Sequence, residues 1–183
     1  MKTTLSFFCV LLLATNLGVV QQQENRGDAC KFSVQDNSVH PTVTGPADIL
    51  PLVYVVEQPD SPLEIISVDL KGTELSVSDE HYTVRDCAKY RVHNRSDRVI
   101  QRFGVALRLN DAGGGSTGML DHNHAALTPG QTAEVGSCNG GGHGGATGNH
   151  VRLVVSVEAI DFGECFYRPS LRIPSSLGIR PVW

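Results

Sequence analysis

The sequence has little that favours helices and no excess of basic charge. It lacks long periods of Ala, Leu, Glu and Lys and has only two methionines, whereas its 19 glycines and nine prolines favour turns. Its 15 lysines and arginines are outnumbered by 19 aspartates and glutamates. A general nucleic-acid binder needs excess basic side chains facing phosphates, so this balance argues against nucleic acid as a partner. The composition predicts a mostly β protein.

One long apolar run is present, at the N-terminus. Lys2 precedes an uncharged stretch rich in Leu, Phe and Val from Leu5 to Val20, and the polar residues Gln21 to Glu24 follow it. This layout is typical of a secretory signal peptide, and the run is short for a membrane span. We therefore expect residues 1–20 to be removed on export. The expected product is secreted or periplasmic, with no transmembrane span in the mature chain.

The chain that remains after this cleavage has about 160 residues, enough for one domain with its own hydrophobic core. We expect an N-terminal extension over residues 21–48, a β-sandwich over residues 49–173 and a proline-containing tail over residues 174–183. Export also places the chain in an oxidising compartment, where cysteines form disulfides.

Alternation of apolar and polar residues marks three strands, over residues 82–94, 103–109 and 151–162. A period of two indicates a strand with one buried and one solvated face. We expect the first two strands to form an antiparallel pair with a shared buried face. The inward residues expected in the third are Val151, Leu153, Val155, Val157 and Ala159. Short strands separated by turns favour a sandwich over a parallel αβ sheet.

The run from Ile49 to Glu57 is also strand-prone, although Pro51 restricts its start to an edge or entry position. One alternative for the whole protein is a subunit of a cell-surface assembly. In that case the stretch from Ile49 to Val56 would be an exposed edge that pairs with another chain.

Four features follow one another along residues 63–170. A strand ends in Tyr-Arg-Val-His-Asn-Arg-Ser at residues 90–96, an alternating strand follows, Leu127 to Gln131 form a turn, and Val151 to Val155 begin the last strand. This order resembles bacterial immunoglobulin-like modules, including the cell-adhesion-related type. The resemblance implies an immunoglobulin-like antiparallel β-sandwich with a non-catalytic binding or structural role and a protein or glycan partner. The chain differs from such modules in its cysteines and in a long Gly/His-rich loop.

Cys9 lies inside the expected signal peptide, and four cysteines remain: Cys30, Cys87, Cys138 and Cys165. An even number in an exported chain implies two disulfides, and the spacing leaves three connectivities open. The topology implied by the resemblance places the strand from Tyr82 beside the strand from Gln131. It therefore implies a Cys87–Cys138 bridge near the rim and a second, Cys30–Cys165, that ties the N-terminal extension to the last hairpin.

Histidines supply the only cluster with metal-ligand character: His122, His124, His143 and His150. Two histidines two residues apart on an extended segment project to the same side, and a third imidazole would complete three nitrogen ligands for zinc or copper. Against this, residues 139–149 are nearly all glycine, and ordering such a loop costs chain entropy. A metal-binding protein or metalloenzyme is therefore the alternative function, and a protein without a cofactor is the simpler interpretation.

Outward positions of the predicted strands carry six cations: Arg85, Lys89, Arg91, Arg102, Arg108 and Arg152. If three of these strands are neighbours, the cations form a basic stripe suited to an anionic glycan, a lipid head group or an acidic partner. The alternative is an ordinary solvated face, on which Lys and Arg also discourage pairing with other sheets.

Two other short motifs match known functional patterns. Gly114 to Gly118 match the nucleophile-elbow pattern around Ser116, but that elbow needs a buried strand before it and a helix after it, and the sequence predicts neither. Asn94 to Ser96 match an N-glycosylation acceptor in a predicted surface turn. The sequence therefore predicts a secreted, non-enzymatic module whose ligand it does not identify.

Overall fold

The computed structural model describes residues 30–35, 39–77, 81–110, 116–123, 126–136, 139–145 and 152–174. Within these residues the chain forms twelve strands and one three-residue 3-10 helix, η1 (Leu50–Leu52), and it contains no α-helix. The prediction of an all-β fold is therefore confirmed. No helix in this part of the chain has the length and apolar character needed to cross a membrane.

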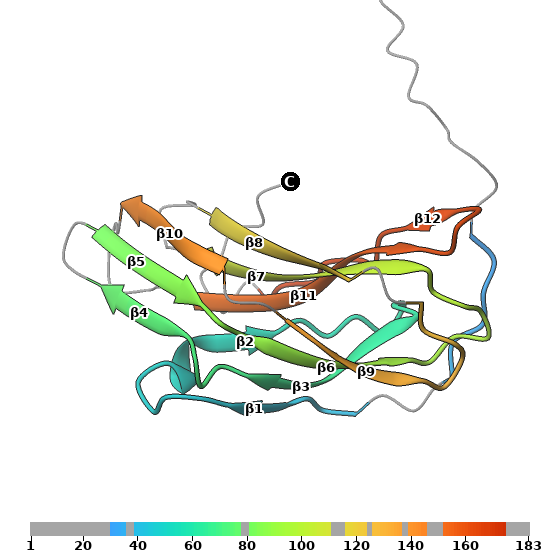
Figure 1. Ribbon diagram of the computed structural model, residues 1–183, viewed down its shortest axis with the longest axis horizontal. Coiled ribbons are helices and arrows are strands. Elements are labelled where there is room, and N and C mark those ends of the chain that lie inside the picture. Colours follow the sequence, from blue (N-terminus) through green and yellow to red (C-terminus); the bar gives the residue numbers. More distant parts are fainter. Residues whose placement is uncertain are drawn as a thin grey trace, which may run out of the picture.

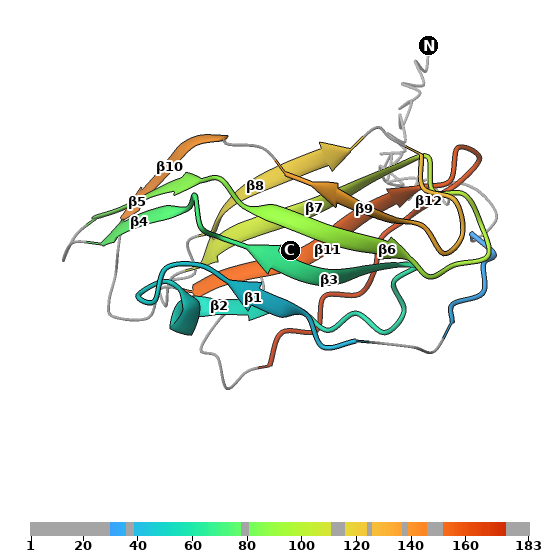
Figure 2. The ribbon, with the colours of Figure 1, turned by 60° about the horizontal axis from the view of Figure 1, so that its bottom comes forward.

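Two larger sheets pack face to face around one core (Figures 1 and 2). The first has the order β1-β3-β6-β9 and consists of β1 (Thr42–Thr44), β3 (Leu63–Asp69), β6 (Lys89–Asn94) and β9 (Thr132–Val135). The second has the order β12-β11-β7-β8, with β2 also on β11, and consists of β2 (Val53–Val55), β7 (Arg102–Asn110), β8 (Ser116–Asn123), β11 (Arg152–Asp161) and β12 (Phe166–Tyr167). A third sheet at one end has the order β10-β5-β4 and consists of β4 (Glu74–Val77), β5 (His81–Asp86) and β10 (Asn139–Gly145).

Both larger sheets are mixed, so the prediction of a purely antiparallel sandwich is wrong. β1 runs parallel to β3, and β2 runs parallel to β11. The reason is that the chain crosses between the sheets over residues 45–52. It leaves the edge of the first sheet after β1 and turns at Pro46, whose carbonyl accepts hydrogen bonds from the Ile49 and Leu50 N–H groups at 3.1 and 3.0 Å. It then joins the edge of the second sheet as β2.

The apolar run predicted as one strand from Ile49 to Glu57 divides into η1 and the short strand β2. Pro51 lies in η1, where its fixed φ and missing N–H are tolerated. Ile49 and Val56, near the two ends of the run, are only 2% and 5% exposed. The run therefore packs within its own chain instead of presenting a continuous apolar edge to a partner.

The strand predicted from Tyr82 to Asn94 is interrupted at Cys87 and Ala88. Its first part, β5, belongs to the third sheet, and its second part, β6, belongs to the first. Because β6 pairs with β3 and β9 whereas β7 pairs with β8 and β11, the predicted antiparallel pairing of these two alternating strands is wrong. The buried polar residues 94–96 turn the chain from one sheet toward the other. The expected neighbours β6 and β9 do pair in antiparallel register.

Alternation correctly identifies the core faces of β6 and β7. Tyr90 and Val92 of β6 are fully buried, and Phe103, Val105 and Leu107 of β7 are at most 2% exposed. The core between the sheets also includes buried residues of β3 and β11, among them Leu63, Ile65, Val68, Leu153, Val155 and Val157. The two strands therefore bury their apolar faces against opposite sides of one core.

β11 departs from simple alternation because a bulge between Val157 and Ala159 shifts its register. As a result Ile160 is fully buried and Ala159, predicted to point inward, is only partly buried. Val154 on the opposite face is buried too, because Leu171 of the C-terminal segment packs against the same small cluster. Both faces of β11 are thus covered, which explains why its residues read as a nearly continuous apolar run.

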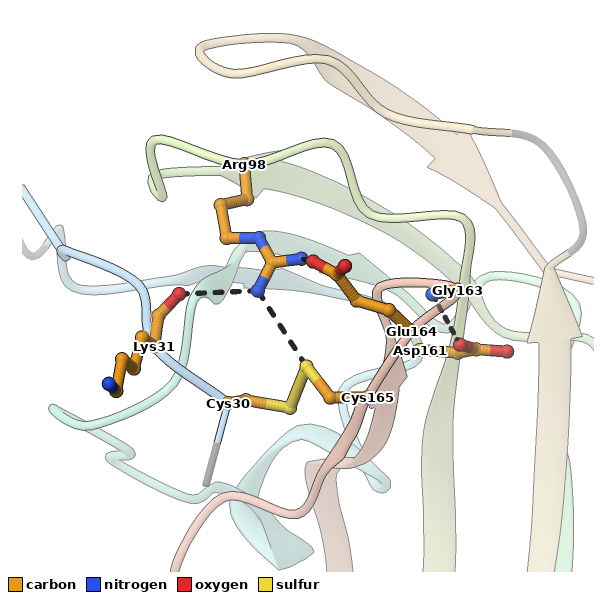
Figure 3. The surroundings of a disulfide bond; sticks show 7 residues. All are labelled: Cys30, Lys31, Arg98, Asp161, Gly163, Glu164 and Cys165. Carbon is orange, nitrogen blue, oxygen red and sulfur yellow. Dashed lines mark hydrogen bonds and ion pairs between the residues drawn. A yellow bond between two sulfur atoms is a disulfide. The ribbon is translucent and has the colours of Figure 1, made fainter. Parts of the chain in front are cut away.

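The disulfide between Cys30 and Cys165 fastens the N-terminal segment to the loop before β12 (Figure 3). Its Cα atoms are 5.6 Å apart, and it is the pairing that the resemblance implied. Arg98 lies beside the bond: its Nη1 donates to the Lys31 carbonyl at 3.2 Å and lies 3.7 Å from Cys165 Sγ, while its Nη2 pairs with Glu164. The corner is therefore held by a covalent bond and by charge-assisted contacts.

The N-terminal segment is also tied to the fold by packing. The Phe32 ring lies 5.4 Å from the ring of Phe162 and 4.9 Å from that of Tyr167, measured between centroids. Val34 forms an isolated bridge with Ser96. Aromatic contacts of this kind add to the free energy gained by burial, so the segment does not depend on the disulfide alone.

Cys87 is disulfide-bonded as well. Its expected partner, Cys138, lies outside the described residues, so the Cys87–Cys138 pairing stays a prediction. Cys87 is partly buried and packs against the turn before β4, where a Cβ added to Gly72 would lie 2.7 Å from Cys87 Cβ. The turn therefore leaves no room for a larger residue at this position.

Candidate binding site

A cavity of about 180 Å³ lies at the side of the sandwich where the edges of the two sheets meet. It is lined by the segment before β1, the end of β2 and the residues after it, the start of β3, Arg95 and Val157. Pockets for drug-sized ligands measure about 300–1,000 Å³. This cavity is smaller, so it suits a small molecule or a single side chain of a partner.

The walls of the cavity are mostly apolar and belong to the core. Val56, Leu63, Ile65 and Val157 are each 6% exposed or less. Leu63 and Ile65 point inward because they occupy alternate positions of β3. Leu63, Ile65 and Val157 are packed between the two sheets, and Val56 is buried in the small cluster with Val154, so the wall they form is part of the rigid framework.

Arg95 supplies a buried positive charge in the wall of the cavity and is only 5% exposed. Its Nε donates to the Ser61 carbonyl at 2.7 Å, and its Nη2 donates to the carbonyls of Pro59 and Gln58 at 2.6 and 3.2 Å. Its own N–H donates to the Pro62 carbonyl at 3.0 Å. The guanidinium plane is therefore fixed by the segment that connects β2 to β3.

No carboxylate pairs with Arg95 in the described part of the chain, where the ion pairs all use other cations. Two acids line the cavity: Glu57 is exposed, and the Oε1 of the partly buried Glu64 accepts the Val39 N–H at 2.8 Å. Burial first, and then the charge of Glu57, raises the pKa of nearby Tyr54. The buried cation is thus met by neutral carbonyls, and the negative charges lie closer to solvent.

Gln58 fixes another wall of the cavity by acting as a strand partner for β11. Its Oε1 accepts the Val157 N–H at 2.8 Å, and its Nε2 donates to the Val157 carbonyl at 2.9 Å and to the Ser170 carbonyl at 3.3 Å. Along the same edge of β11, β2 pairs with Leu153–Val155 and β12 pairs with Ile160–Asp161. The Gln58 amide therefore fills the gap between these two strands at the bulge.

Asp60 anchors the same connecting segment to the C-terminal segment. Its carboxylate accepts the Tyr167 hydroxyl at 2.8 Å and the Ser170 N–H and hydroxyl at 2.9 Å each. Burial by itself would raise the pKa of Asp60, but these hydrogen bonds together hold it below the ordinary value. Burial and then the hydrogen bond to Asp60 raise the pKa of Tyr167 to about 12.

The histidines predicted as metal ligands are divided between elements. His122 lies in β8 of the second sheet and His143 lies in β10 of the third, while His124 and His150 lie outside the described residues. Residues 139–145 form a strand paired with β5, so the prediction of a loop is wrong for these residues. Strand pairing uses main-chain N–H and carbonyl groups, which glycine has like any other residue. Among the described residues no group of three side chains suits a metal ion.

The six cations predicted to form a basic stripe lie on three different sheets, and Arg85 is on β5 of the third. Lys89 and Arg91 are on β6 of the first, and Arg102, Arg108 and Arg152 are on β7 and β11 of the second. Three of them pair with acids: Lys89 with Glu134 at 3.8 Å, Arg108 with Glu158 at 2.6 Å, and Arg102 with Asp161. The Gly163 N–H and then Arg102 lower the pKa of Asp161. At least half of the six cations are therefore matched by acids of neighbouring strands.

The predicted glycosylation site is not in an exposed turn, because Asn94 is fully buried. Its Nδ2 donates to the carbonyls of Arg98 and Leu127 at 2.8 and 2.9 Å, and its Oδ1 accepts the Ser96 N–H at 3.0 Å and the Ser96 hydroxyl at 2.7 Å. The nitrogen that would carry a glycan is thus used inside the fold. The interpretation of these residues as a surface acceptor is wrong for the folded chain.

Sequence reasoning did not single out Arg95, Gln58 or Asp60 as site residues. The signal that could have indicated Arg95 is the polar run at residues 94–96, which follows the alternating strand. A single sequence does not distinguish a buried arginine from a solvated one. No protein-family model, curated protein or solved structure matches the chain.

Proposed function

We propose that the chain is an exported, non-catalytic binding module with an immunoglobulin-like β-sandwich, and that the cavity beside Arg95 is its ligand site. Export is supported by the signal-peptide pattern of residues 1–20 and by the Cys30–Cys165 bond, since disulfides persist mainly in oxidising compartments. The immunoglobulin-like assignment is supported by two facing sheets and by the antiparallel pairing of β6 with β9.

One observation carries the binding role: a cavity with walls of core residues contains a buried guanidinium that no carboxylate of the described residues pairs with. A buried charge without a counter-ion is costly, and such charges are usually paired. An incoming ligand with a negative group would recover part of this cost.

The test is a thermal-shift screen of small polar compounds on the exported protein. A ligand of the cavity raises Tm for the wild type and has no effect on Val55→Phe, because the added ring fills space at the cavity wall. Val99→Phe is the matched control, since Val99 is exposed and does not line the cavity. Compounds that stabilise wild type and Val55→Phe equally, or a screen without any stabilising compound, would contradict the proposal.

Metal binding is the second candidate, favoured by the contact between β8 and β10. This contact brings the strands that carry His122 and His143 side by side, and pairing of β10 with β5 removes the cost of ordering a free loop. We expect zinc or copper in the purified protein and a lower Tm after chelation, with both effects absent in His122→Asn/His143→Asn. His93→Asn, on β6, is the control. Metal-free protein that does not respond to either ion would exclude this function.

A further inference from the structure

The charges around the cavity are arranged by depth. Arg95 is almost completely buried, Glu64 is partly buried, and Glu57 and His40 are exposed. The positive charge therefore lies inside, and the two carboxylates lie nearer the mouth. Glu64 uses one oxygen for the Val39 N–H, which leaves its second oxygen available as an acceptor.

This arrangement discriminates between classes of ligand. A simple anion would be attracted to Arg95 but repelled by Glu57 and Glu64 as it entered. A simple cation would be attracted to the glutamates but would leave the guanidinium without a counter-ion. A molecule that carries both charges satisfies both regions, and complementarity of this kind determines specificity more than total affinity.

The rest of the cavity lining is mostly apolar, and the cavity is small. Valine, leucine, isoleucine and proline side chains surround it, and its 180 Å³ corresponds to about six water volumes. A branched aliphatic group fills such a space well, because burial of its methyl groups against valine and isoleucine is favourable. A large ring system or a sugar chain exceeds the volume.

We propose that the cavity binds a small zwitterion with an aliphatic body, the chemical class of the free aliphatic α-amino acids. The carboxylate pairs with Arg95, the ammonium group faces Glu57 and Glu64, and the side chain packs against the apolar wall. This inference rests on the proposed function, because it names the ligand class of the same cavity.

The test compares four probes by titration calorimetry on the exported wild-type protein. L-Leucine carries all three features, leucinamide lacks the carboxylate, 4-methylpentanoate lacks the ammonium group, and glycine lacks the aliphatic body. We expect leucine to bind at least about tenfold more tightly than each of the others, since each probe leaves one charged or apolar group of the site unmatched. Equal binding of leucine and either single-charge probe would overturn the assignment.

A variant separates the ammonium contact from folding. Glu57→Gln changes an exposed side chain, and we expect it to weaken leucine binding about tenfold while leaving 4-methylpentanoate binding unchanged or stronger. Glu74→Gln, at an exposed position of β4 outside the cavity, is the control and should bind leucine like the wild type. Loss of binding to both probes in Glu57→Gln would contradict the predicted role of Glu57.

The two proposals fail in different ways. If other compounds stabilise the protein through the cavity and no amino acid does, the ligand class is wrong and the binding role stands. If neither amino acids nor the wider screen give a response that Val55→Phe removes, both proposals are wrong.

Discussion

At the scale of single residues, the corner after β6 shows how buried polar groups determine this fold. Asn94 makes four hydrogen bonds from a fully buried position, and Arg95 next to it makes three more through its side chain. Six of these seven bonds involve a main-chain group, and the seventh is made with the Ser96 hydroxyl. The same corner therefore turns the chain and fixes the wall of the cavity.

Asn94→Ala removes one donor to each of the Arg98 and Leu127 carbonyls, and it leaves the buried Ser96 N–H without its Asn94 acceptor. We expect a loss of about 3 kcal/mol in the free energy of unfolding, because buried polar groups left unpaired cost about 1–3 kcal/mol each. Urea unfolding of the wild type and the variant measures this loss. Gln101→Ala, an exposed control, should cost under about 0.5 kcal/mol. Equal stability of the two variants would contradict the buried role of Asn94.

Gly136 and Gly130 form a matched pair, since both have positive φ, +141° and +75°. A Cβ on Gly136 would lie 2.3 Å from the Ala88 carbonyl oxygen and 2.9 Å from Lys89 Cα, whereas a Cβ on Gly130 meets nothing within 4 Å. We expect Gly130→Ala to cost about 1–2 kcal/mol from backbone strain alone. Gly136→Ala should cost clearly more, or prevent folding, as measured by thermal and urea unfolding. Similar costs would show that β9 does not approach residues 88–89 this closely.

At the scale of elements, the edge of β11 that faces away from β7 is covered by three different partners. β2 pairs with its first half, β12 pairs with its end, and the Gln58 side chain bonds to Val157 between them. Unpaired strand edges favour aggregation, so this closure protects the sandwich. It also joins the cavity wall to the C-terminal segment through Ser170.

Gln58→Ala leaves both main-chain groups of Val157 without these partners. We expect a destabilisation of about 2 kcal/mol and faster hydrogen exchange at the Val157 amide, with the β2-paired Val155 region less affected. Glu57→Ala, one residue earlier and exposed, is the control. Unchanged protection of Val157 in the Gln58 variant would refute the role of this side chain as a strand partner.

The Asp60 anchor predicts a specific dependence of stability on pH. Its folded-state pKa lies below the ordinary value of 3.8, so its contribution is complete above that value and is lost as pH falls through the folded-state pKa. Asp60→Asn should therefore be less stable than the wild type at neutral pH, and the difference should shrink in acid. Asp48→Asn, in an exposed turn, is the control for a general charge effect. A stability difference between the wild type and Asp60→Asn that stays constant from neutral to acid pH would contradict the prediction.

The sequence predicts strands better than it predicts their partners. Alternation is a local signal, so it identifies the buried residues of β6 and β7. Which sheet each strand joins depends on the corner at Asn94 and on the break at Cys87, and neither follows from periodicity. Periodicity also does not predict the bulge at Val157 or the glycine-rich strand β10, because both depend on main-chain pairing. Burial of Arg95 depends on carbonyls that the fold brings to it from residues 58–61.

At the scale of the whole molecule, the segment that begins at Cys30 and the segment that follows β12 are both fastened to the sandwich. The Cys30–Cys165 bond fastens the N-terminal segment, and Asp60 and Gln58 fasten the C-terminal segment beside β12. A native disulfide typically contributes about 2–4 kcal/mol to the free energy of unfolding. Gln58 is itself a lining residue of the cavity, so its bonds to Val157 and Ser170 fix part of the wall that a ligand meets. Binding to such a site needs little rearrangement.

A titration of the isotope-labelled protein with L-leucine, followed residue by residue in ¹⁵N NMR spectra, tests whether the cavity binds an aliphatic amino acid. We predict that the perturbed amides lie at residues 39–40, 55–58, 63–65, 95 and 157, and that the Arg95 guanidinium signals shift with them. Perturbations centred on β8 and β10, or spectra that do not change at saturating leucine, would contradict it.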